Sequence, residues 1–123
     1  RQAGRLGRTR SHCARRHQVK RCVLRPLARQ DRRDEVRYYR DEAGAVVAAK
    51  LVAALKSALR TLQQQPAIGS PLLGRELELT QMRTWLVDGF PLAFWYFERE
   101  THIDVVRLVG QRQDALGIDL GTD

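Results

Sequence analysis

A single stripe of apolar residues constrains the fold of this chain more than any other feature of its sequence. Across residues 45–65, apolar side chains recur at intervals of three and four: Val47, Leu51, Ala54, Leu55, Ala58 and Leu62. This spacing places them on one face of an α-helix, which Pro66 ends because proline lacks a backbone N–H. A helix cannot bury such a stripe alone, so the rest of the chain must supply a partner layer.

A second helix is expected directly before this one. Residues 28–43 carry apolar side chains at helical spacing among many charges, and Gly44 is placed to end the helix. With one residue between them, the two helices should fold back as a hairpin. The preceding run, residues 21–27, is expected to be a short strand at an edge or end of a sheet because it contains Pro26.

The second half of the chain changes to a strand pattern. After a turn-rich stretch at residues 66–71, three runs are rich in β-branched and aromatic residues, namely 82–87, 92–99 and 102–109. The short turns between them are typical of consecutive hairpins. The sequence therefore predicts an α+β fold in which an N-terminal strand and two helices precede a three-stranded meander. The helical hairpin packs on a curved antiparallel β-sheet.

The middle run of the meander is apolar on both of its faces. Side chains point alternately to one face (Leu92, Phe94, Tyr96) and to the other (Ala93, Trp95, Phe97). One layer of helices covers only one face, so the other needs either a partner or cover from the tail at residues 115–120. Trp85, Trp95 and Phe97 are therefore candidates for a partner-binding face. Core packing is the alternative for both tryptophans.

The positive charge of the chain is concentrated at its N-terminus. The formal net charge is +8, residues 1–21 hold eight cations and no acids, and the remaining 14 cations match the 14 acids. We expect a basic flexible leader at residues 1–20 and one domain at residues 21–123 that does not bind nucleic acid specifically. The leader lacks the apolar centre of a secretory signal, and no run could form a membrane helix, which favours a cytoplasmic protein.

The two cysteines do not predict a metal site. Cys13 and Cys22 lie in or beside the leader, near His12 and His17. Structural zinc sites usually draw their ligands from two separated clusters, and the sequence has no second cluster. We expect free thiols in a reducing compartment, no metal and no cofactor.

A series of short motifs follows the predicted helical hairpin in a characteristic order. The motifs are Pro66-x-x-Gly69-Ser70, Met82-Arg83-x-Trp85, Gly89-Phe90-Pro91 and Val105-Val106-Arg107-Leu108-Val109. Together they resemble the RelE/ParE superfamily of toxins from type II toxin–antitoxin systems, and ParE more closely. The resemblance covers about residue 20 to residue 115. The sequence departs from the family pattern at Arg32, where a Leu is common, and at Gly110, where many members have a His.

The resemblance implies one of two activities. RelE-like toxins cleave messenger RNA on the ribosome with basic residues on the sheet and a C-terminal Tyr, whereas ParE-like toxins poison DNA gyrase without known hydrolytic chemistry. The positions that match those sheet cations hold Met82, Thr84, Leu86 and Pro91, and the Tyr position falls near Ile118. Cleavage needs a base, an acid and cations, so we name no catalytic residue. His102 could transfer a proton, but a lone His at a strand start is more often a solvated or packing residue.

We therefore expect a ParE-like toxin that inhibits growth by binding a protein target, with DNA gyrase the target that the resemblance implies. Arg83, Arg107 and Arg112 are candidates for target contacts, because Arg is enriched at interface hot spots and holds carboxylates with two hydrogen bonds. The alternative is a surface role or internal pairing with acids such as Asp104 or Asp114. The resemblance also implies a cognate antitoxin whose C-terminal segment folds onto the exposed sheet face and helical hairpin, in a hetero-oligomer.

Two other interpretations stay open on the sequence alone. The first is a ribosome-dependent endoribonuclease of RelE type, which would be tested by whether RNA cleavage survives Arg112→Ala and Arg83→Ala. The second is a non-toxic, degenerate member that only binds antitoxin. The unusual Arg32 and Gly110 are compatible with that second interpretation. A toxic phenotype on expression would remove it.

Overall fold

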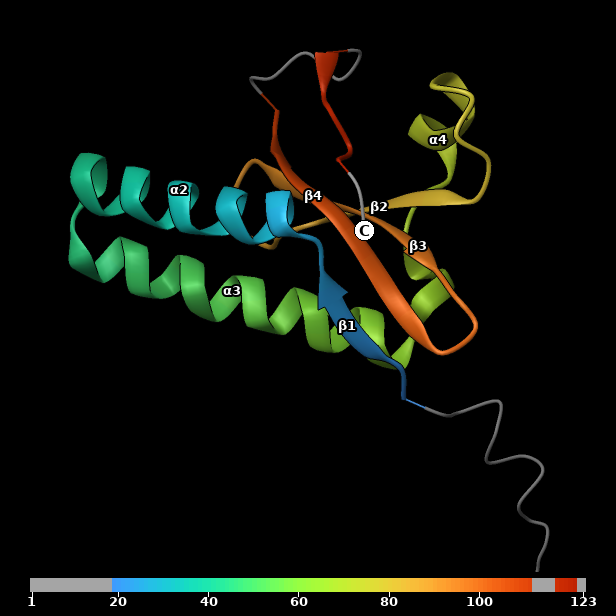
Figure 1. The fold of residues 1–123 in the computed structure, drawn as a ribbon. Helices are drawn as coiled ribbons and strands as arrows, with labels where there is room; N and C mark the ends of the chain where they lie inside the picture. Colours follow the sequence, from blue (N-terminus) through green and yellow to red (C-terminus); the bar gives the residue numbers. More distant parts are fainter. Residues whose placement is uncertain (1–18, 112–116, 122–123) are drawn as a thin grey trace, which may run out of the picture.

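The computed structural model describes residues 19–111 and 117–121, and it begins with a strand followed by a helical hairpin (Figure 1). Strand β1 (Arg21–Leu24) leads into helices α2 (Pro26–Ala43) and α3 (Ala45–Gln64). Gly44 reverses the chain between the helices with a φ of 97°, a conformation that favours glycine. The predicted hairpin is confirmed. No helix among the described residues is long and apolar enough to cross a membrane.

Pro26 has a different role from the one that the sequence suggested. We expected a strand over residues 21–27 with Pro26 near its end, but β1 stops at Leu24 and Pro26 begins α2. Proline suits the first turn of a helix, because its fixed φ is helical and the N–H that it lacks would have no partner there. Pro26 therefore marks the start of α2 rather than the end of β1.

The sheet contains four strands in the order β1-β4-β3-β2. Strands β2 (Met82–Leu86), β3 (Leu92–Glu98) and β4 (His102–Gly110) form the predicted antiparallel meander. Strand β1 pairs with β4 in parallel, so the complete sheet is mixed rather than purely antiparallel. Parallel neighbours need a long connection, which the helical hairpin and the meander supply. A register shift between Trp95 and Tyr96 bends β3 against β4.

The main core lies between the helical hairpin and one face of the sheet. The predicted stripe of α3 supplies four buried residues, Leu51, Leu55, Ala58 and Leu62. They pack in one cluster with buried side chains of the sheet: Leu92, Phe94, Tyr96, Ile103, Val105 and Leu108. Burial of this many large apolar side chains is the dominant stabilising term of such a domain. It holds α2 and α3 in a fixed position over the sheet.

The second face of the sheet has a smaller core of its own. Met82, Trp95, Val106 and Val109 are buried there. One side of this cluster is covered by Leu73 of α4 (Leu72–Glu76), a helix that the sequence pattern did not predict, and by Leu77 and Leu79 of the loop after it. The short helix η1 (Pro66–Ile68) follows α3, and its Pro66 carbonyl accepts a hydrogen bond from the Tyr96 hydroxyl at 2.7 Å. The other side of the cluster is covered by Ile118 and Leu120. The tail therefore folds back onto this face, as one of the two predicted alternatives required.

Candidate partner-binding groove

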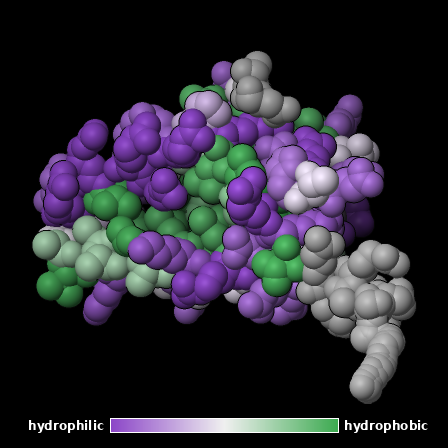
Figure 2. Space-filling view, turned by 60° about the horizontal axis from the view of Figure 1, so that its bottom comes forward, coloured by the Kyte–Doolittle hydropathy of each residue, from purple (hydrophilic) through white to green (hydrophobic). Residues whose placement is uncertain are grey.

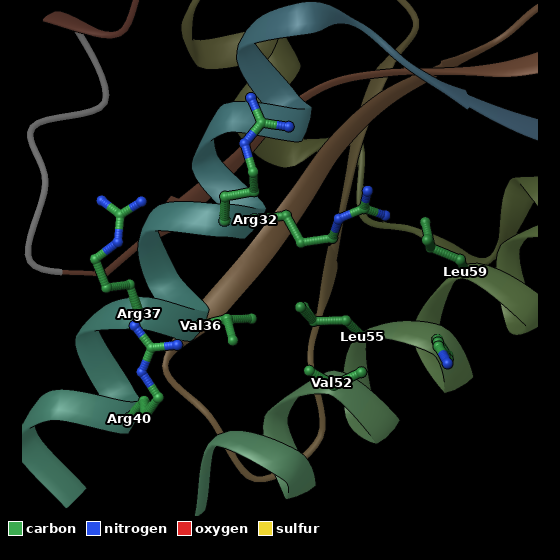
Figure 3. A pocket seen from close by; sticks show the side chains of 9 residues that line it. Arg32, Val36, Arg37, Arg40, Val52, Leu55 and Leu59 are labelled. Atoms are coloured by element: carbon green, nitrogen blue, oxygen red, sulfur yellow. The ribbon is translucent and has the colours of Figure 1, made fainter. Parts of the chain in front are cut away.

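A groove with a volume of about 390 Å³ lies between α2 and α3 on the outside of the helical hairpin. Its floor is formed by four apolar side chains: Val36, Val52, Leu55 and Leu59. Val36 points from α2 toward Val52 and Leu55 of α3 (Figure 3). In the space-filling view, apolar surface lies in a hollow between hydrophilic side chains over the hairpin (Figure 2). The hairpin thus leaves part of its apolar interface open to a partner.

The rim of this groove is cationic. It is formed by Arg32, Arg33, Arg37 and Arg40 of α2 and by Lys56 of α3. Arg32, Val36 and Arg40 are four residues apart, so they lie on one face of α2. Two cations of the rim and an apolar residue of the floor therefore share this face. In the rim, Arg37 lies 3.8 Å from Asp34 and Arg40 lies 3.7 Å from Asp41. Both ion pairs are exposed, so they contribute little to stability. The groove therefore presents positive charge around an apolar centre.

This cationic rim corrects an inference from composition. The balance of 14 cations and 14 acids in the body suggested that the body has no basic face. Two of the five acids of α2 are, however, directed away from the groove: Asp31 faces β4 and Glu35 is buried. A neutral body can carry a basic surface when fold and helical period separate the two signs of charge.

Arg107 lies in an internal ion pair with Asp31. It donates through Nε and Nη2 to the two carboxylate oxygens of Asp31, at 2.7 and 2.9 Å. The backbone N–H of Leu108 also donates to Asp31, at 3.0 Å. Both charged side chains are mostly buried, with 14% and 15% exposed, and the hydrogen bonds to Asp31 raise the pKa of Arg107. The pairing is with Asp31 rather than Asp104, and Asp114 lies outside the described residues.

The structure does not bring Arg83 and Arg107 together into one patch. Arg83 pairs in register with Tyr96, whereas Arg107 pairs with Trp95, so their side chains leave opposite faces of the sheet. Arg83 is half-buried and donates to the Gly69 carbonyl at 2.7 Å. Arg112 lies outside the described residues. Neither described arginine stands free on the surface.

The aromatic candidates are also largely engaged. Trp95 is only 3% exposed and belongs to the second core, so the core-packing alternative describes it. Trp85 is half-buried and packs against the main core. Phe97 packs at the edge of the second core, with the Arg99 guanidinium 4.5 Å from its ring centroid. None of the three aromatic residues lines the groove over the helical hairpin.

Two acids that the sequence did not single out as functional organise the interior. Besides Asp31, Asp104 of β4 accepts hydrogen bonds from Arg25 at 3.0 and 2.8 Å and from Arg99 at 3.1 and 2.9 Å. Burial by itself would raise the pKa of Asp104, but the hydrogen bonds from Arg25 and Arg99 outweigh it and lower the pKa. These partners are 79 and 5 residues away, so sequence spacing gave no signal for the first.

The element order and the mixed sheet define a small α+β domain with a RelE/ParE-like fold. Residues 22–115 match the family described as "ParE toxin of type II toxin-antitoxin system, parDE", and the chain belongs to this family. A solved structure described as "Chromosomal ParDE TA system from P. aeruginosa" aligns with a TM-score of 0.63 at 20% identity, over 76% of this chain and 97% of that chain. That likeness concerns the fold. Among curated protein sequences, none matches significantly.

Proposed function

We propose that this protein is a growth-inhibiting toxin that acts by binding a protein target, DNA gyrase, and not by cutting RNA. Membership of the ParE family supports DNA gyrase as the target. The preference for gyrase binding over RNA cleavage rests on the cations of the sheet, which are either engaged in other contacts or missing. Arg83 is bound to a backbone carbonyl and Arg107 to a carboxylate, and Met82 is fully buried where RelE-like toxins carry a cation. These groups leave little free positive charge for a phosphate in a cleavage transition state.

Brief induction of the protein in bacteria tests this proposal. Poisoning of gyrase should switch on the DNA-damage response early while bulk translation continues, and messenger RNA should stay intact. Immediate arrest of translation with cuts at codon positions would contradict the proposal in favour of the ribonuclease. No effect on growth would contradict it in favour of a non-toxic antitoxin binder. Uninduced cells and cells that express Gly69→Trp serve as controls, since a side chain at Gly69 would overlap Tyr96 and we expect this variant not to fold.

We further propose that the cognate antitoxin neutralises this protein by placing an acidic amphipathic helix in the groove between α2 and α3. A helix in such a groove anchors apolar residues at positions i, i+3, i+4 and i+7. The floor of Val36, Val52 and Leu59 would receive those residues. Glu and Asp on the flanks of the helix would meet the five cations of the rim. Gyrase and antitoxin both belong to the cytoplasm, so this is where we place the protein, in a toxin–antitoxin hetero-oligomer.

Charge reversal on the rim tests the proposed groove. In Arg37→Glu/Arg40→Glu, the affinity for the antitoxin should fall at least about tenfold, which corresponds to about 1.4 kcal/mol. The unchanged protein should bind less tightly as salt rises, and the variant should lose most of this dependence. The control, Lys50→Glu/Arg75→Glu, reverses the same number of exposed charges outside the groove. Equal affinities for the two variants would refute this site. Growth inhibition by the groove variant should persist but escape neutralisation.

A further inference from the structure

The segment at residues 118–121, here called the strap, lies on the second face of the sheet. In Figure 1 it turns back and runs beside β4. Ile118 and Leu120 pack against the second core, which contains Trp95 and Val106. Alternate residues that face one surface are the pattern of an extended segment. The strap therefore occupies a surface that suits an extended peptide.

Two arginines hold the backbone of the strap. Arg107 donates to the carbonyl of Asp119, and Arg25 donates to the carbonyl of Leu120 at 3.5 Å. The two guanidinium groups are themselves fixed, Arg107 by Asp31 and Arg25 by Asp104. Because carboxylates hold them in place, these donors lose little freedom when a carbonyl arrives. Every residue has such a carbonyl, so the pair of arginines suits the backbone of any extended segment.

The strap does not fill the surface that it covers. A hollow of about 350 Å³ remains between it and the loop after α4. Trp95, Leu77 and Leu79 line this hollow beside the two apolar side chains of the strap. The hollow is an apolar surface depression that further apolar side chains can fill, so a segment bulkier than the strap would bury more of it. The exposed acids Glu76 and Glu78 also line the hollow, which favours a positively charged occupant.

We propose that this surface, the strap site, binds an extended segment of a partner protein. That segment would carry large apolar residues at alternate positions with Lys or Arg beside them. The strap occupies the site in the free protein and competes with the partner segment. Ordering a short strap costs conformational entropy that offsets the burial of two apolar side chains, so the strap is readily displaced. The strap site differs in charge and in backbone shape from the groove, which favours an acidic helix.

A peptide-binding measurement on the full chain tests this proposal. Ile118→Ser/Leu120→Ser, the strap variant, should release the site. The probe is a labelled peptide with the sequence of residues 117–121 preceded by two lysines, followed by fluorescence polarisation. We expect it to bind the strap variant at least tenfold more tightly than the unchanged chain. A peptide with serines at both apolar positions should bind neither protein. Equal binding to the two proteins, or no binding to the strap variant, would overturn the proposal.

A second, independent experiment tests whether the acids of the hollow select a positively charged occupant. Adding Glu76→Lys/Glu78→Lys to the strap variant should weaken binding of the dilysine peptide severalfold and leave the same peptide without lysines unaffected. Leu86→Ser replaces an exposed apolar residue on β2, 60% exposed, and serves as the control that should not release the site. Loss of binding for both peptides alike would show that the acids do not select the occupant.

Trp95 reports on the strap without a label. The chain has two tryptophans, so Trp85→Phe leaves Trp95 as the sole emitter. In that background the strap variant should show red-shifted Trp95 emission and stronger quenching by acrylamide, and the dilysine peptide should reverse both. Hydrogen exchange on the unchanged chain needs no substitution. The strap amides should exchange much faster than those of β4, and excess peptide should accelerate them further. A strap as protected as β4, or an unchanged Trp95 emission, would refute the competition.

Discussion

Replacement of Asp31 by Asn should destabilise the protein far more than the same change at an exposed acid of α2. In Asp31→Asn, the guanidinium of Arg107 loses its negatively charged partner. The amide also keeps only one oxygen acceptor, where the carboxylate offers two to Arg107 and to the N–H of Leu108. Breaking a buried ion pair from one side costs about 3–5 kcal/mol. The exposed fractions of 14% and 15% leave some contact with water, which reduces this to roughly 2–4 kcal/mol. For a domain of this size the expected fall in Tm is roughly 10–20 °C.

Thermal unfolding and urea titration of purified protein measure this effect. Asp34→Asn is the matched control. Asp34 lies on the same helix, but it is 53% exposed, and its ion pair with Arg37 is long, at 3.8 Å. That control should change stability by less than about 0.5 kcal/mol. Asp31→Leu/Arg107→Leu should recover much of the loss, because it removes both buried charges together. Similar Tm values for Asp31→Asn and Asp34→Asn would refute the view that this pair fastens α2 to β4.

Three further predictions concern pH, packing and the leader. The pKa of Asp104 is lower in the folded than in the unfolded protein, so its ion pairs stabilise the fold above the ordinary pKa near 4 and lose this effect as the pH falls through the folded pKa. Urea titrations from pH 6 to pH 2 should therefore show a smaller loss of stability in Asp104→Asn than in the unchanged protein, and equal losses would be contrary evidence. In Gly69→Ala, the new Cβ would lie 2.4 Å from the Tyr96 hydroxyl, whereas Gly117→Ala meets nothing within 4 Å. We expect a loss of roughly 1–3 kcal/mol for the first and almost none for the second, measured by urea unfolding. Deletion of residues 1–18 should leave Tm and growth inhibition unchanged, and loss of either would show that the leader is functional.

Most of the fold could be predicted because its elements have strong local signals. Apolar residues at intervals of three and four in α3, the glycine before it and the proline after it determine one helix of the hairpin. Alternation and short turns determine the meander. Pro26 was misassigned because the same residue ends strands and begins helices. The parallel pairing of β1 with β4 depends on where the hairpin returns the chain, which no local pattern encodes.

The candidate sites were less predictable because they depend on contacts between distant residues. Asp31 and Arg107 are 76 residues apart, and their pairing follows from the crossing of α2 over β4. Arg107 was predicted as a target contact, but sequence spacing alone could not identify its partner. The cationic groove was hidden by a neutral composition, since only the helical faces show which charges point outward. Helical spacing of Arg32, Val36 and Arg40 was the available signal, and it becomes informative once the packed face of α2 is known.

The central proposal is that this protein poisons DNA gyrase and does not cut messenger RNA. It is tested most directly by mixing the purified protein with each of the two targets. DNA gyrase with supercoiled plasmid goes in one reaction, and ribosomes translating a defined messenger RNA go in the other. The claim predicts inhibition of gyrase with cleaved plasmid trapped on the enzyme, relief of that inhibition by the antitoxin, and uncut messenger RNA. Cut messenger RNA with unaffected gyrase would contradict it.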